Sequence, residues 1–134
     1  MPQIKWPIPW NEEIHMHFSG FVNSFIKKNF RPRWEHVLLT KPDKAKNELH
    51  RFEHHNDSRK CTLLDNTSLL SFLDIKISLN RGLFFDGYGL PEFQTGKEIA
   101  NRFWGFTEDS IFSIEAGKKV IVISHDGYGW LCVK

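Results

Sequence analysis

Cysteines are few in this sequence and long apolar runs are absent, and both features restrict what the protein can be. Only Cys61 and Cys132 occur in 134 residues, and both stand in short apolar runs, so we expect buried free thiols rather than a disulfide scaffold. No apolar run is long enough to span a bilayer, and the first residues lack the basic-then-apolar pattern of a signal peptide. We therefore expect a cytoplasmic protein that has no membrane partner.

A strong excess of charge of either sign is also missing, because the formal net charge is only +2. The charges are nevertheless unevenly placed: residues 27–60 hold ten Lys and Arg against five acids, and residues 86–126 hold seven acids against four bases. The basic block also contains Phe30, Trp34 and Phe52, so a nucleic-acid-binding module that uses residues 27–60 is one alternative. Because the overall charge is near neutral and no recognition motif is present, a solvated basic face is the favoured interpretation.

Sequence motifs for catalysis or for cofactor binding are scarce. The chain has no Gly-x-Ser-x-Gly elbow, and its paired glycines lack both the third glycine and the following helix of a phosphate-binding loop. His15 and His17 are two residues apart and face different sides of a helix. His125 stands beside Asp126, but that Asp is better explained by the turn it begins with Gly127. These absences favour a protein that is not an enzyme.

The sharpest chemical pattern is HxxEH, formed by His50, Glu53 and His54 on a predicted helix. Residues four apart share a helix face, so the two imidazoles suit a zinc ion, with the glutamate as a base. The pattern resembles the inverzincin metalloproteases, but that family requires a larger catalytic domain and a further ligand downstream. A small zinc-dependent hydrolase that uses residues 50–54 is therefore a second alternative. The favoured interpretation is a solvated, His-rich helix face, so we expect no metal and no cofactor.

Aromatic residues are plentiful, at 14% of the chain, and they mark the first predicted helix. The length predicts a single domain, residues 1–134, with residues 1–10 as an extended arm held by Trp6 and Trp10. Asn11 is a good helix cap, and Arg31-Pro32 predicts that the helix ends near Phe30. Its apolar positions follow helical spacing: Ile14, Phe18, Phe21, Val22, Phe25 and Ile26.

The middle of the chain gives weaker signals. We predict a strand over Trp34–Thr40, a surface helix over Pro42–His54 with a thin apolar stripe (Ala45, Leu49, Phe52), and a short strand over Cys61–Leu64. Residues 67–79 are ambiguous between helix and strand, and we favour a helical turn up to Leu73 followed by a strand over Ile75–Leu79. The remaining predictions are a turn at residues 80–82, a pairing segment at 83–85 and a helix over Gln94–Phe103.

Three apolar runs near the C-terminus predict a β-meander around which the rest of the chain is organised. The runs cover residues 111–114, 120–123 and 130–133, and turn residues separate them. Three adjacent strands are stable only when an apolar face is covered, and the Phe-rich helix is the natural cover. The predicted fold class is therefore α+β: an antiparallel sheet that the N-terminal helix and one or two further helices cover.

The last third of the chain resembles the cytoplasmic immunity proteins of bacterial polymorphic-toxin and contact-dependent growth inhibition systems. The resemblance lies in Ile99-Ala100-Asn101, in Gly105, and in the stretch DSIFSIEAGKKVIVISHDGYGWL that begins at Asp109. It implies a non-enzymatic antitoxin that binds one toxin domain and blocks its active site or its access to substrate. Inhibitors of nucleases are often clearly acidic, whereas this chain is slightly basic. Either the acidic C-terminal half makes the contact, or the toxin is not a nuclease.

A partner-binding surface is predicted at two Gly-rich turns that share the motif DGYG, residues 86–89 and 126–129. Tyrosine and tryptophan beside carboxylates make good binding hot spots, and loops commonly carry recognition residues. The predicted set is Asp86, Tyr88, Glu92, Glu108, Asp109, Asp126, Tyr128 and Trp130. For Trp130, a place in the core is an equally open interpretation, because large rings are mostly buried.

Overall fold

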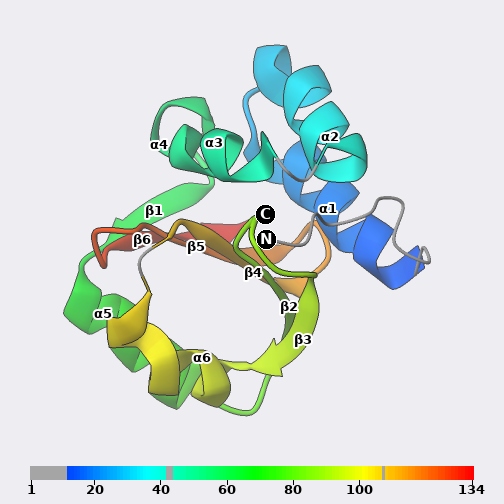
Figure 1. Ribbon diagram of the computed structural model, residues 1–134. Helices are drawn as coiled ribbons and strands as arrows, with labels where there is room; N and C mark the ends of the chain where they lie inside the picture. The colour runs from blue at the N-terminus through cyan, green and yellow to red at the C-terminus, as the bar shows by residue number, and fades with distance from the viewer. Residues whose placement is uncertain (1–11, 42–43, 107) are drawn as a thin grey trace.

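A six-stranded antiparallel sheet forms the centre of the protein, in a computed structural model that describes residues 12–41, 44–106 and 108–134. The strands are β1 (Cys61–Leu64), β2 (Arg81–Phe85), β3 (Glu92–Thr95), β4 (Ser110–Glu115), β5 (Lys119–Ile123) and β6 (Gly129–Val133), and their order in the sheet is β1-β6-β5-β4-β2-β3. Helices cover both faces of this sheet (Figure 1). The α+β class predicted from the sequence is confirmed.

The C-terminal meander of β4, β5 and β6 is also confirmed. Its three strands lie between β1 on one side and β2 on the other. Phe112 pairs with Ile121, which in turn pairs with Leu131. The β4–β5 turn contains Gly117, whose φ of +72° favours glycine. Alternate side chains of these strands point to opposite faces, so each face needs its own cover.

One face of the sheet is covered by α1 (Glu12–Phe25), the short 3₁₀ helix η1 (Lys28–Phe30), α2 (Arg31–Thr40), α3 (Ala45–His50) and α4 (Phe52–His55). The predicted packing of the first helix on the meander is present in this layer. Phe21 and Phe25 of α1 are fully buried in the core that also contains Val120, Val122 and Trp130 of the sheet. Ala45, Leu49 and Phe52, the predicted thin stripe, are buried in the same core.

The opposite face is covered by α5 (Asn66–Ser71), the π-helical segment η3 (Phe72–Lys76), α6 (Gly96–Arg102) and the 3₁₀ helix η4 (Phe103–Gly105). Figure 1 shows this second layer on the other side of the sheet from α1 to α4. Its core contains Leu69, Leu73 and Ile99 with Phe112 and Ile121 of the sheet. The helical cover is thus more extensive than the sequence predicted.

The predicted strand over Trp34–Thr40 is wrong, because these residues belong to α2. Trp34, Val37 and Leu38 are the buried positions, and their spacing of three and four residues is helical. The first helix also ends five residues before Phe30, at Phe25. Ile26 instead forms a β-bridge with Asn56, and the Lys27 amide donates to the His55 carbonyl, so pairing with a distant segment replaces further helical turns.

The predicted strand over Ile75–Leu79 is also wrong. The helix of α5 continues as η3 to Lys76, and Leu73 and Ile77, four residues apart, are the buried positions. Strand β3 was not predicted, and it takes Gln94 and Thr95 from the N-terminal end of the predicted helix over Gln94–Phe103. A capping box formed by Thr95 and Glu98 makes α6 begin at Gly96.

The remaining local predictions have mixed outcomes. Strand Cys61–Leu64 is confirmed as β1, and Leu83–Phe85 pairs within β2, which already begins at Arg81 in the predicted turn. The predicted helix over Pro42–His54 appears as α3 and α4, interrupted at Arg51. The arm at residues 1–10 lies outside the described residues.

Both cysteines are buried and free, as predicted. Cys61 of β1 is paired in register with Cys132 of β6, and burial raises the pKa of the Cys132 thiol. Within residues 12–41, 44–106 and 108–134, no helix has the length and apolar character needed to cross a membrane.

Candidate functional site

One end of the sheet gathers most of the residues that the sequence marked for partner binding. Antiparallel pairing places the C-terminal ends of β2 and β5 beside the N-terminal ends of β3, β4 and β6. The pairs that show this are Phe84 with Glu92, Phe85 with Ile111, Ser110 with Ile123, and Ile123 with Gly129. Residues 86–92, 108–109 and 124–128 therefore lie at this same end, which we call the turn end. Seven of the eight predicted residues belong to it: Asp86, Tyr88, Glu92, Glu108, Asp109, Asp126 and Tyr128.

The first turn of the turn end is held by its own side chains and by α3. The Asp86 carboxylate accepts hydrogen bonds from the backbone amides of Tyr88 and Gly89. Gly87 has a φ of +83°, and a Cβ atom at this position would lie 2.9 Å from the backbone nitrogen of Lys46 in α3. The Lys46 ammonium in turn lies 5.0 Å from the centre of the half-buried Tyr88 ring. The turn is thus packed against the helical layer.

The second turn shares the left-handed glycine of the first, but Ser124 accepts its hydrogen bonds. Gly127 has a φ of +89°, and its amide donates to the Ser124 carbonyl, while the Asp126 amide donates to the Ser124 hydroxyl. In both copies of DGYG the first glycine takes a left-handed conformation. The repeated motif is therefore explained by turn geometry.

Trp130, the eighth predicted residue, lies in the core. Its side chain is only 8% exposed, and its ring packs edge-to-face with Phe52 of α4 at a centroid distance of 5.3 Å. Tyr128 also packs edge-to-face with Trp130, at a centroid distance of 5.4 Å, and is half-buried. The buried Trp130 ring therefore helps to hold the Tyr128 ring in place.

A cavity of about 260 Å³ opens at the turn end between the helical layer and the sheet. Its wall includes Asp109, Asp126, Tyr128 and Trp130 from the predicted partner-binding set. The same cavity is lined by His50, Glu53 and His54 of the HxxEH pattern and by His125. Two groups of residues that the sequence singled out for different reasons thus share one cavity.

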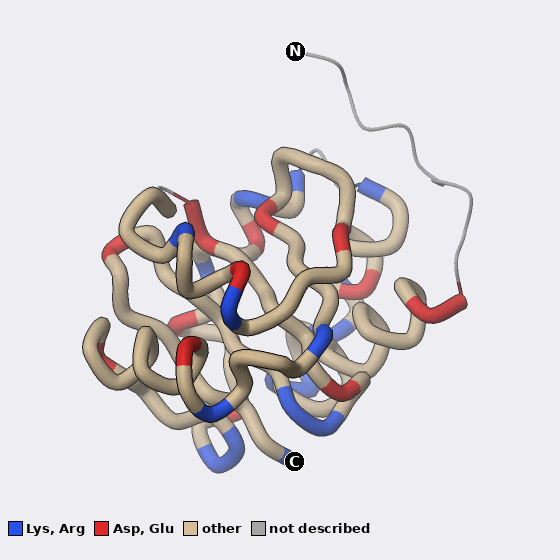
Figure 2. Tube along the Cα trace, turned by 90° about the horizontal axis from the view of Figure 1, so that it is seen from below, with Lys and Arg blue, Asp and Glu red and all other residues tan. Residues whose placement is uncertain are grey.

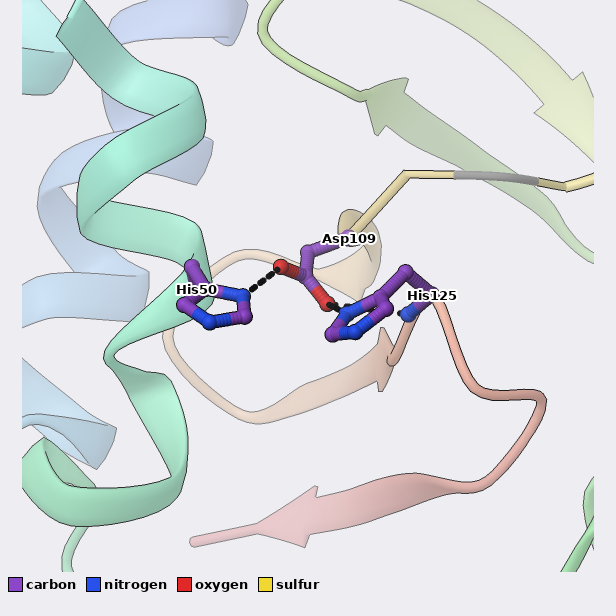
Figure 3. Close-up of side chains that lie close together, drawn as sticks. All are labelled: His50, Asp109 and His125. Carbon is purple, nitrogen blue, oxygen red and sulfur yellow. Dashed lines mark hydrogen bonds and ion pairs between the residues drawn. The ribbon is translucent and has the colours of Figure 1, made fainter.

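Three side chains at this cavity form a cluster that the sequence did not predict (Figure 3). The Asp109 carboxylate lies between two imidazoles: Oδ2 is 3.1 Å from Nδ1 of His50, and Oδ1 is 3.0 Å from Nδ1 of His125. The backbone amide of His125 also donates to Asp109 Oδ1, at 2.9 Å. The hydrogen bond to Asp109 raises the pKa of His125.

The elements that carry the cluster explain why these residues meet. Asp109 stands immediately before β4, and His125 follows its hairpin partner β5, so antiparallel pairing returns the two residues to the same end of the sheet. That neighbourhood could have been derived from the predicted hairpin. His50 is the last residue of α3, and it lies beside Asp109 because of how the helical layer packs on the sheet, which no local sequence pattern predicts.

The HxxEH residues do not form the zinc site that the hydrolase alternative requires. The helix is interrupted at Arg51, which lies between the last residue of α3 and the first residue of α4. Among the residues that the structure describes, one group of at least three metal-ligating side chains has its donor atoms within 4.8 Å of one another, and it combines His50 with Asp109 and His125. Glu53 and His54 line the same cavity without joining that group.

The basic block of residues 27–60 is partly neutralised by acids within it. The buried Glu48 carboxylate pairs with Arg33 at 2.6 Å and with Arg51 at 3.4 Å, and Arg59 pairs with Asp57 at 3.1 Å. Basic and acidic residues are interspersed along the chain trace in the view of Figure 2. These ion pairs reduce the positive charge that this block presents to a nucleic acid.

Comparisons of the chain with protein-family models, with curated proteins and with solved structures give no match.

Proposed function

We propose that this protein is a non-enzymatic immunity protein, which acts in the cytoplasm and neutralises a cognate bacterial toxin domain. The turn end contacts the toxin and blocks its active site or its access to substrate. The observation that carries this proposal is the gathering of seven predicted binding residues, spread over residues 86–128, at one end of the sheet.

The chemistry of the turn end fits a protein partner. Tyr88 and Tyr128 are half-buried rings whose positions are fixed by Lys46 and Trp130, so they offer contact area at a low cost in entropy. Rigid recognition loops of this kind lose little conformational freedom on binding.

The charge of the turn end indicates a basic surface on the partner. Five carboxylates belong to it, and they come from Asp86, Glu92, Glu108, Asp109 and Asp126. Complementary charge accelerates association and rejects wrong partners. A basic toxin surface also agrees with the acidic C-terminal half of a chain that is slightly basic overall.

The test begins with the gene beside this one, where we expect a large secreted protein with a variable C-terminal domain. That domain, expressed alone in bacteria, should arrest growth, and co-expression of this chain should restore it. Purified chain should bind the purified domain in calorimetry, and raised salt should slow the association because the contact is electrostatic. A chain that neither restores growth nor binds the domain contradicts the proposal.

A matched pair of charge reversals locates the contact. Asp126 lies at the turn end with an exposed side chain, and Glu115 is exposed at the opposite end of the sheet, beside the β4–β5 turn. Asp126→Lys should weaken binding about tenfold or more, because it places a cation against a basic surface. Glu115→Lys should leave the affinity within about twofold, because it lies outside the contact. Equal effects of the two variants would contradict a contact at the turn end.

A further inference from the structure

The geometry points to a divalent transition-metal site, of the kind that zinc occupies, formed by His50, Asp109 and His125. The three residues offer two imidazole nitrogens and one carboxylate oxygen, and these atoms lie within 4.8 Å of one another. Imidazole nitrogen suits zinc, copper, iron and nickel, and two histidines with one carboxylate form a recurrent zinc-binding set. The expectation of no metal rests on the HxxEH residues and on histidines that are close in sequence, and the HxxEH pattern supplies only His50 to this set.

The distances already approach those of a coordination shell. Zinc binds nitrogen and oxygen at about 2.0–2.2 Å, so two ligands of a tetrahedral ion lie about 3.4 Å apart. Asp109 Oδ2 is 3.1 Å from His50 Nδ1, and Asp109 Oδ1 is 3.0 Å from His125 Nδ1. Each of these two contacts needs to lengthen by only a few tenths of an ångström, and all three donor atoms already lie within 4.8 Å of one another.

The ligands are held on ordered elements before any ion arrives. His50 ends α3, Asp109 precedes β4, and His125 follows β5. The Asp109 side chain is 12% exposed, and the backbone amide of His125 fixes one of its oxygens at 2.9 Å. A carboxylate held by a backbone donor keeps its orientation, which lowers the entropy cost of binding an ion.

A carboxylate behind one of the ligands gives a second, independent indication. Oδ2 of Asp126 lies 3.4 Å from Nε2 of His125, the ring nitrogen that faces away from Asp109. Histidines that bind metals almost always donate the other ring N–H to a carboxylate, a carbonyl or water, and this fixes the tautomer and makes the imidazole a better ligand. Asp126 is placed for that role toward His125.

Three protein ligands leave further coordination positions on the ion, and these face the cavity of about 260 Å³. The His50 side chain is 66% exposed, so ions have an open path from solvent. The inference concerns the isolated chain and does not require the proposed toxin partner, so either proposal can fail while the other stands.

The test measures zinc binding by untagged, metal-stripped chain, with calorimetry and with competition against a coloured chelator. We expect one zinc ion per chain. Removing a residue that only orients a metal ligand typically lowers metal affinity about 10–100-fold. His50→Ala and His125→Ala remove the ligands themselves, so each should lower the zinc affinity by at least about 100-fold. Asp126→Asn should weaken it about tenfold. Co²⁺ absorbs visible light in a way that depends on its ligands, so cobalt bound to the wild type should give a visible absorption spectrum. The His50→Ala variant should lack that spectrum.

His54→Ala is the matched control, because His54 lines the same cavity and belongs to the HxxEH pattern but not to the cluster. It should bind zinc as tightly as the wild type. Because His50 is exposed, His50→Ala should keep the wild-type fold, which circular dichroism checks. The inference is overturned if the wild type binds no zinc at one per chain, or if His50→Ala binds as tightly as the wild type. It is equally overturned if His54→Ala loses as much affinity as His50→Ala.

Discussion

His17 is a titratable residue buried at the contact between α1 and the sheet. Its ring nitrogen Nδ1 lies 2.6 Å from the Ser113 hydroxyl of β4, and Phe93 packs edge-to-face against the ring at 5.8 Å. Burial lowers the pKa of His17 from its ordinary value of 6.5; Glu13 opposes this change, and Arg81 adds to it. The charged form is therefore disfavoured in the folded protein.

The lowered pKa of His17 predicts a loss of stability in mild acid. As the pH falls below 6.5, His17 becomes protonated in the unfolded chain but stays neutral in the folded protein until a lower pH. The free energy of unfolding therefore falls as the pH falls from 6.5 toward the lowered pKa of His17. The pKa of His55 is also lowered by burial and adds to the trend, whereas the raised pKa of His125 opposes it. Urea unfolding at about pH 7.5 and about pH 5.5 should show a smaller loss for His17→Gln than for the wild type. Equal losses in the two proteins would contradict this account of His17.

Single residues of the candidate site were predictable, but their meeting was only partly so. Turn chemistry indicates Asp126, and the acidic character of the C-terminal half indicates Asp109. The Asp109–His125 contact follows from hairpin pairing of their neighbouring strands. His50 contacts Asp109 across 59 residues, and that contact depends on how the helical layer packs, which local sequence does not encode.

At the scale of elements, α1 meets the β4–β5 turn through two glycines. A Cβ atom on Gly20 would lie 2.6 Å from the backbone nitrogen of Gly117, and the Ser24 hydroxyl donates to the Gly117 carbonyl at 2.7 Å. The missing side chain lets the helix approach the backbone of the turn. Gly20 was not singled out in the sequence, because a glycine inside a helix gives no local sign of what it packs against.

Gly20→Ala tests this close approach, because the contact predicts that the variant is less stable than the wild type rather than more stable. In an exposed helix the change stabilises by about 1 kcal/mol, but here the added methyl group meets backbone atoms that cannot rotate away. We expect a net destabilisation of about 1–3 kcal/mol in urea unfolding. Ser19→Ala, the neighbouring helical position, should change stability by less than about 0.5 kcal/mol. A Gly20→Ala protein more stable than the wild type would contradict the contact.

Element prediction succeeded for the C-terminal meander and failed for two short apolar runs, although proline or turn signals bound those runs as well. The strands β4, β5 and β6 are separated by Gly-containing turns and were predicted with nearly correct bounds. Residues 34–40 and 75–79 contain short apolar runs that suit either a strand or a helix, and burial at spacings of three and four decides them only in the folded protein.

At the scale of the whole molecule, one sheet separates two helical layers and has two distinct ends. The sequence predicted the sheet and the layer that contains α1, because the apolar faces of the Phe-rich helix and of the meander are buried only when they pack together. It did not predict the second layer, because residues 75–79, part of which continue that layer's helix, suit a strand as well. Helices cover both faces of the sheet, and exposed polar residues such as His125 and Asp126 lie at the turn end.

The central claim is that the turn end binds a toxin domain, and hydrogen–deuterium exchange on the chain alone and in complex tests it most directly. Backbone amides that become buried or rigid in a complex exchange more slowly. We predict that exchange slows on complex formation at residues 86–92 and 124–128 and does not change at residues 115–119, at the opposite end of the sheet. Slower exchange at residues 115–119, with unchanged exchange at 86–92 and 124–128, would contradict the claim.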